Sequence, residues 1–172
     1  RMKVVVPLTL FIIVLLLYLS TGSVTKLVIV LLAVPFSLVG AFWILYLLGY
    51  NLSVAVAVGI IALAGVDAET GVVMLLYLDL SYHRWKDGKR LQSLRDLEAA
   101  VVEGAVKRVR PKMMTVMAIL MGLLPIMWGH GAGADVMKRI AAPMVGGIIT
   151  SFLMELLIYP VIFTIWKWRW EV

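Results

Sequence analysis

The sequence lacks cysteine altogether and contains few charged residues, which make up 15% of its 172 positions. The absence of cysteine excludes disulfide bonds and thiolate metal sites. The scarcity of charge, set against 63% apolar residues, is far from the composition of a soluble domain. The low content of charged residues and the high content of apolar residues favour a protein whose surroundings are mostly apolar.

Long apolar runs account for this composition. A helix needs roughly 20 mostly apolar residues to cross a bilayer. Five runs meet this length, at about 4–20, 27–48, 52–78, 112–129 and 140–166. The first is followed directly by further spans and has no small-residue cleavage site, so we interpret it as a helix and not as a signal peptide. The sequence predicts an all-α fold, a polytopic membrane helix bundle in one transmembrane domain over residues 1–172.

The distribution of Lys and Arg predicts the orientation of the chain. If the amino end lies outside, twelve of the sixteen basic residues lie on the inner side. Because cytoplasmic loops carry the excess of Lys and Arg, this orientation is favoured, with the carboxyl end in the cytoplasm. The topology explains most of the net charge of +6, so we expect no nucleic-acid partner.

The one long polar segment, from Asp79 to Arg110, contains apolar residues at helical spacing. We expect an amphipathic helix over 89–108, lying on the cytoplasmic surface of the bilayer. Pro111 follows it and is expected to end this helix before the fourth span begins.

Enzyme activity is not indicated. His83 and His130 are expected at opposite membrane faces, so they cannot share a metal ion. No nucleophile and base stand in a recognisable arrangement, and we expect neither an enzyme nor a permanently bound cofactor.

Four ionisable residues lie within or at the ends of apolar spans, and these are Asp67, Glu69, Lys112 and Glu155. Such residues normally face a protein interior or a water-filled path, where they pair or carry protons. Glu69 lies about 15 Å from the inner end of its span at ~1.5 Å per residue, and Lys112 enters the next span from that side. The sequence therefore predicts contact between Glu69 and Lys112.

Asp67 is two residues from Glu69, about 200° around the helix, so the two carboxylates point to nearly opposite sides. Asp67 needs another partner or stays protonated. A role in proton transfer and a purely structural polar contact are both open for Asp67 and for Glu155.

Met113, Met117 and Met121 follow each other at four-residue spacing on one helical face. Thioethers suit Cu(I) and Ag(I) because these ions are soft. A methionine stripe is more often adaptable packing, which is the reading we favour here.

Several long motifs together are similar to one transporter family. They are "VPFSLVGAFWILYLLGYNLSVAVAVGIIALAG", "ETGVVMLLYL", "RVRPKMMTV" and "GLLPIMWGHGAGADVMKRIAAPMVGG". They resemble the heavy-metal-efflux branch of the resistance–nodulation–division (RND) transporters, in particular its copper- and silver-exporting members. The resemblance covers nearly the whole chain but only the last five of the family's twelve membrane helices.

The resemblance implies a proton-driven antiporter of the bacterial inner membrane that exports Cu(I) and Ag(I). It implies a proton relay in which Glu69 and Lys112 match the family's glutamate and lysine, whereas the third member of the relay, an acidic residue on the family's fourth helix, is absent from this sequence. It also implies that Met137 belongs to a methionine pair on the metal path. Asp67 and Glu155 depart from the family pattern: either could replace the missing acid, satisfy other contacts or be neutral drift, and Asp67 is included as a further candidate for the relay.

The family further implies partners besides the lipid bilayer. These are the amino-terminal remainder of the pump, two further copies in a homotrimer, a periplasmic adaptor and an outer-membrane channel. The alternative hypothesis is a truncated, non-transporting membrane protein that acts as a structural or regulatory partner through helix packing.

Overall fold

The structure, a computed structural model, describes residues 2–170, without the side chains of Met2 and Val6. The described chain forms five helices: α1 (Met2–Thr21), α2 (Val24–Leu48), α3 (Val54–Asp87), α4 (Leu94–Trp128) and α5 (Ala134–Trp170). Arg1, whose charge entered the topology count, lies outside the described residues. The predicted all-α fold is confirmed.

Each of the five helices is long and apolar enough to cross a membrane. Helices α3, α4 and α5 contain 34, 35 and 37 residues. At ~1.5 Å per residue such a helix is about 50 Å long, which exceeds a hydrocarbon core of roughly 30 Å. These three helices therefore have room for a polar extension beyond a membrane span.

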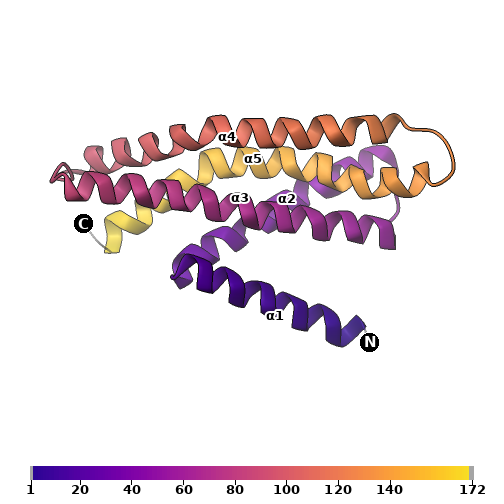
Figure 1. Ribbon diagram of the computed structural model, residues 1–172, viewed down its shortest axis with the longest axis horizontal. Coiled ribbons are helices and arrows are strands. Elements are labelled where there is room, and N and C mark those ends of the chain that lie inside the picture. The colour runs from indigo at the N-terminus through magenta and orange to yellow at the C-terminus, as the bar shows by residue number, and fades with distance from the viewer. Residues whose placement is uncertain (1, 171–172) are drawn as a thin grey trace.

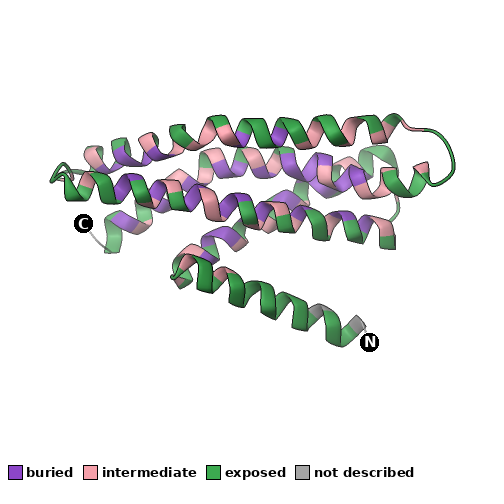
Figure 2. Cartoon of the chain, viewed as in Figure 1, coloured by how far each residue is buried: buried purple, intermediate pink, exposed green. Residues whose placement is uncertain are grey.

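Helices α3, α4 and α5 lie side by side along the long axis, and α2 crosses them obliquely (Figure 1). Helix α1 stands apart from this bundle, and its apolar residues are almost all exposed (Figure 2). Short turns connect the helices; Gly49 ends α2 with φ of 66°, a left-handed conformation that glycine adopts without strain. The bundle of α2–α5 therefore holds the buried positions.

The predicted surface helix over 89–108 is wrong in its bounds, because α4 runs without interruption from Leu94 to Trp128 with Pro111 inside it. Its apolar face packs on protein: Leu97, Val101 and Gly104 are buried. Helices that pack on neighbours tolerate an internal proline, since those neighbours hold the helix where one hydrogen bond is lost.

The polar ends of α3 and α4 pair with each other as a helical hairpin. Ser81 donates a hydrogen bond to the carbonyl of Ala100 (2.7 Å), and the Trp85 indole donates to Glu103 (2.7 Å). A Cβ at Gly104 would lie 2.9 Å from the carbonyl oxygen of Tyr77, so the two backbones approach closely. Glycine is thus required where α4 crosses α3.

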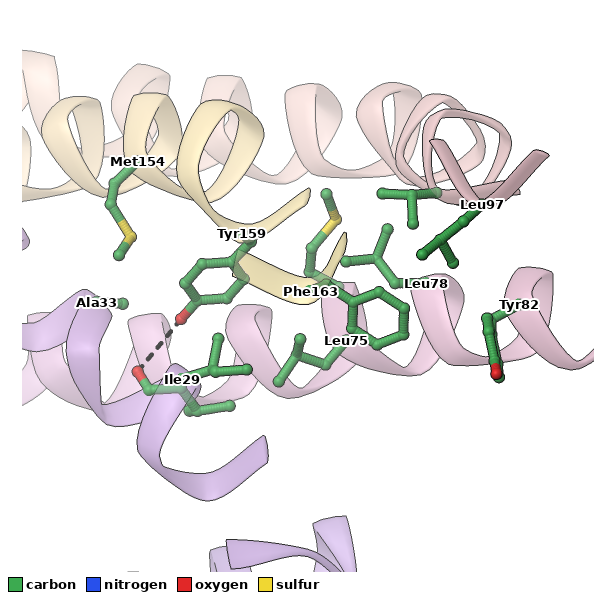
Figure 3. Packing of buried hydrophobic residues seen from close by; sticks show 12 residues of the cluster. Ile29, Ala33, Leu75, Leu78, Tyr82, Leu97, Met154, Tyr159 and Phe163 are labelled. Atoms are coloured by element: carbon green, nitrogen blue, oxygen red, sulfur yellow. Dashed lines mark hydrogen bonds between the residues drawn. The ribbon is translucent and has the colours of Figure 1, made fainter. Parts of the chain in front are cut away.

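The largest apolar cluster joins α2, α3, α4 and α5 around the aromatic rings of Tyr82, Tyr159 and Phe163 (Figure 3). The Tyr159 hydroxyl donates a hydrogen bond to the carbonyl of Val30 (3.2 Å), which links α5 to α2. This cluster lies next to the buried charges described below, because Tyr159 is one turn beyond Glu155 on α5.

Candidate functional site

An ion pair between α4 and α5 is buried in the bundle. The Nζ atom of Lys112 lies 2.7 Å from Oε2 of Glu155, and the two side chains are 5% and 1% exposed. A buried charge requires such a partner, since either group alone would be costly in a medium without water.

The second oxygen of Glu155 faces α3. The Thr70 hydroxyl lies 2.8 Å from Oε1 of Glu155. The single hydrogen of this hydroxyl has two other possible acceptors, both backbone carbonyls of α3, and the Glu155 oxygen is the nearest of the three. The Ser151 hydroxyl, one turn before Glu155, lies 3.5 Å from the same oxygen. Donors from three helices therefore surround Glu155, and such donors stabilise a carboxylate in its ionised form.

Asp67 lies one turn before Thr70 on α3 and is 1% exposed. The Ser37 and Ser151 hydroxyls flank its carboxyl group, which also interacts electrostatically with Lys112 and Glu155. Its Oδ2 atom is buried and has no hydrogen-bond partner within the described part of the chain. This carboxyl group is therefore enclosed by protein but incompletely satisfied.

Glu69 lies on the opposite, exposed face of α3. The expectation that Asp67 and Glu69 point to opposite sides is confirmed, but the expected contact between Glu69 and Lys112 is wrong for this structure. A similar depth in the membrane brings two residues to the same level, but it does not determine the rotation of their helices about the helix axes. The inner face of α3 carries Asp67 and Thr70, and Lys112 turns toward α5.

The partner of Lys112 was missed by sequence reasoning. Glu155 was recognised as an intramembrane charge, but no partner was assigned to it. Two signals in the sequence could have been used: Ser151 stands one turn before Glu155, and Thr70 stands one turn after Asp67. Small polar residues at helical spacing from a carboxylate indicate a polar interior face.

A second ionic cluster joins α2, α3 and α5 near the end of α3. Asp79 lies 2.9 Å from the ammonium of Lys26 and 3.7 Å from that of Lys167. The Lys167 ammonium also lies over the rings of Tyr82 (4.5 Å) and Trp166 (4.7 Å). This cluster holds three helices together without exposing Lys167, which is 3% exposed.

Met137 lies in the first turns of α5 and is 55% exposed. It lines a surface pocket of about 570 Å³ with His130, at the turn between α4 and α5. Met113, Met117 and Met121 are 41%, 50% and 65% exposed on α4, so they do not pack in the bundle interior. Within residues 2–170 no group of three His, Asp or Glu side chains could hold a metal ion.

Comparison with known proteins covers nearly the whole chain. Residues 1–167 match the sequence profile of the AcrB/AcrD/AcrF family. SilA of Salmonella typhimurium is 51% identical over 162 residues, 93% of this chain and 16% of SilA. The cation efflux system protein CusA of Escherichia coli is 49% identical over 175 residues, 100% of this chain and 17% of CusA.

The fold is similar to that of a solved relative. A crystal structure of a heavy metal efflux pump (crystal form II) superposes with a TM-score of 0.82 at 32% identity, over 98% of this chain and 16% of the pump. The chain thus spans about a sixth of the length of the relatives it matches. It belongs to the AcrB/AcrD/AcrF family of RND transporters, in the heavy-metal efflux branch.

Proposed function

We propose that the chain is the carboxyl-terminal membrane part of a proton-driven pump that exports heavy-metal cations, with Cu(I) and Ag(I) as substrates. The names of its relatives support the class of substrate, because CusA is a cation efflux system protein and the solved relative is a heavy metal efflux pump. The motifs shared with copper- and silver-exporting members favour soft monovalent cations within that class.

The observation that carries the proton-driven part of the proposal is the buried Lys112–Glu155 ion pair beside Asp67. Ionisable groups are expensive inside apolar helices, and in transporters they mark paths for ions or protons. A bundle with no role in ion movement would be equally well held by apolar contacts at these positions.

In this proposal Lys112 and Glu69 are members of the proton relay, with Asp67 as a weaker candidate. Glu69 is exposed on α3. Its relay partner is therefore a residue outside these five helices, or it is Lys112 after a change of rotamer. Lys112 exchanges between Glu155 and a second carboxylate as protons arrive and leave.

Met137 is proposed as one ligand on the metal path. Its thioether is exposed at one end of the bundle and can reach a soft ion delivered by another part of the pump. The stripe of Met113, Met117 and Met121 carries no such assignment.

The proposed location is the bacterial inner membrane, with the amino end in the periplasm and the carboxyl end in the cytoplasm. The count of Lys and Arg supports this orientation. The proposed assembly is a homotrimer that works with a periplasmic adaptor and an outer-membrane channel. The charged hairpin of α3 and α4 would then face the cytoplasm.

The test is metal resistance in cells that express the complete pump containing this segment. We expect Lys112→Met or Glu69→Gln to abolish resistance to copper and silver, each metal being tested separately, at unchanged protein levels. Lys107→Met is the matched control, since Lys107 is exposed on the same helix and pairs only with surface groups. Full resistance of both relay variants would refute the relay assignment.

The alternative is a non-transporting membrane protein that acts as a packing partner. Helix α1 supports this alternative, because its apolar surface is exposed and can bind another membrane helix. Purification from native membranes distinguishes the two: a stable oligomer of this chain alone would favour the alternative, and a complete pump would favour transport.

A further inference from the structure

We propose that Asp67, Lys112 and Glu155 form an internal proton site that holds one exchangeable proton on the Oδ2 atom of Asp67. This inference deepens the proposed function, on which its physiological meaning rests. The site differs from the Glu69 relay because it lies entirely within α2–α5 and uses two carboxylates that the family pattern does not require.

The charges of the three side chains do not balance when both carboxyl groups are ionised. Asp67 and Glu155 would carry two negative charges when ionised, and Lys112 supplies one positive charge. A cluster with an excess negative charge, enclosed by helices in a bilayer, is costly. One bound cation removes the excess, and a proton is the smallest that the enclosed space can accept.

The hydrogen bonds of the two carboxyl groups assign that proton to Asp67. Glu155 faces the ammonium of Lys112 at 2.7 Å and the hydroxyl of Thr70 at 2.8 Å, so its ionised form is satisfied. Asp67 has a buried Oδ2 atom with no hydrogen-bond partner among residues 2–170. A buried oxygen without a donor fits a neutral acid far better than a carboxylate.

Within residues 2–170, Lys112 is the one cation that interacts with the Asp67 carboxyl group. On α5 the facing titratable groups are Glu155 and Tyr159, and on α4 the facing group is Lys112, which itself interacts electrostatically with Arg108. On α2 the neighbouring group is the hydroxyl of Ser37. Lys112 is thus the one ammonium that both carboxyl groups share.

Proton release has a structural consequence. An ionised Asp67 becomes a second counter-ion for Lys112, whose ammonium has three hydrogens and gives one to Glu155. Lys112 then bridges α3 and α5, and α4 is drawn toward α3. Proton binding at Asp67 releases this bridge, so occupancy of the site is coupled to the packing of three helices.

Infrared spectroscopy of the chain in lipid nanodiscs tests the site without any transport assay. A protonated, buried carboxylic acid has a C=O stretching band that an ionised carboxylate lacks. We expect one such acid per chain, assigned to aspartate by isotope labelling, and expect its band to disappear as the pH is raised. Absence of the band at every pH would overturn the proposal.

The variants give distinct expected results, provided that circular dichroism shows unchanged helix content. Asp67→Asn removes the band. Glu155→Gln also removes it, because Asp67 then becomes the sole counter-ion of Lys112. Lys112→Met keeps it and adds a second band from a protonated glutamic acid, because both carboxyl groups then bind protons. The control Asp135→Asn, at a carboxylate that is 73% exposed, leaves the band unchanged.

Persistence of the band in Asp67→Asn would overturn the assignment, and so would an unchanged band in Glu155→Gln together with no glutamic-acid band in Lys112→Met. The titration is repeated with sodium replaced by N-methylglucamine. Loss of the band on adding sodium at constant pH would assign the site to that ion instead. Since the readout is protonation, the site can be confirmed while metal resistance fails to depend on it, and the reverse also holds.

Discussion

The ammonium of Lys112 lies 2.7 Å from the carboxylate of Glu155, and both side chains are almost fully buried between α4 and α5. The pair connects two helices that neighbour each other in sequence but meet at this level only because the chain reverses at residues 129–133. The pair therefore lies where the inward faces of the two helices meet.

Removing one member of this pair is expected to destabilise the bundle. Glu155→Leu takes away the 2.7 Å partner of Lys112, but Asp67 can ionise and act as the counter-ion, so the cost is expected to stay below the roughly 3–5 kcal/mol of a buried charge without any partner. The double variant Lys112→Met/Glu155→Leu is expected to recover most of that loss, because apolar side chains pack well at these positions. Unfolding in mixed micelles, followed by circular dichroism, measures both; additive effects of the single variants would contradict the pairing.

Gly104→Ala is expected to separate α4 from α3. The added methyl group would lie 2.9 Å from the Tyr77 carbonyl oxygen and 3.0 Å from Cβ of Ser81, so a backbone has to shift at a cost of about 1–3 kcal/mol. Gly122→Ala on the same helix is the control, since a methyl group there meets no atom within 4 Å. Equal stability of the two variants in a thermal unfolding assay would argue against the close crossing.

Asp79→Asn is expected to weaken the ionic cluster that joins α2, α3 and α5. The substitution removes the charge that faces Lys26 and the buried Lys167, and because Asp79 is 18% exposed, screening limits the loss to about 1–2 kcal/mol. Asp135→Asn is the matched control at an exposed ion pair with Arg139, where less than about 0.5 kcal/mol is expected. A cluster without structural importance would make the two variants indistinguishable in thermal unfolding.

Ser93→Ala is expected to fray the start of α4. The Ser93 side chain accepts a hydrogen bond from the backbone N–H of Asp96 (3.3 Å) and donates to its carboxylate (2.9 Å). Loss of such a cap costs about 1 kcal/mol. Ser23 precedes α2 without a side-chain capping bond, so Ser23→Ala is the control and should have no measurable effect. Hydrogen exchange at the amides of the first turn of α4 reports the difference.

Some features of the fold follow from local patterns. Five apolar runs of sufficient length predict five helices, because a backbone in a bilayer must satisfy its own hydrogen bonds. The opposite directions of Asp67 and Glu69 follow from helix geometry alone. The continuity of α4 through Pro111 does not follow from a local pattern, since it depends on contacts with α3 and α5 that compensate for a missing hydrogen bond.

The sequence by itself determined the all-α class, the five membrane-crossing helices, and the presence of Asp67, Glu69, Lys112 and Glu155 within apolar surroundings. These properties depend on hydropathy and helical period, which are local. Only the tertiary structure decided that Lys112 pairs with Glu155, that Asp67 faces the interior and that Glu69 faces outward. The rotation of each helix about its axis is determined by the packing of several helices at once, and no single segment contains that information.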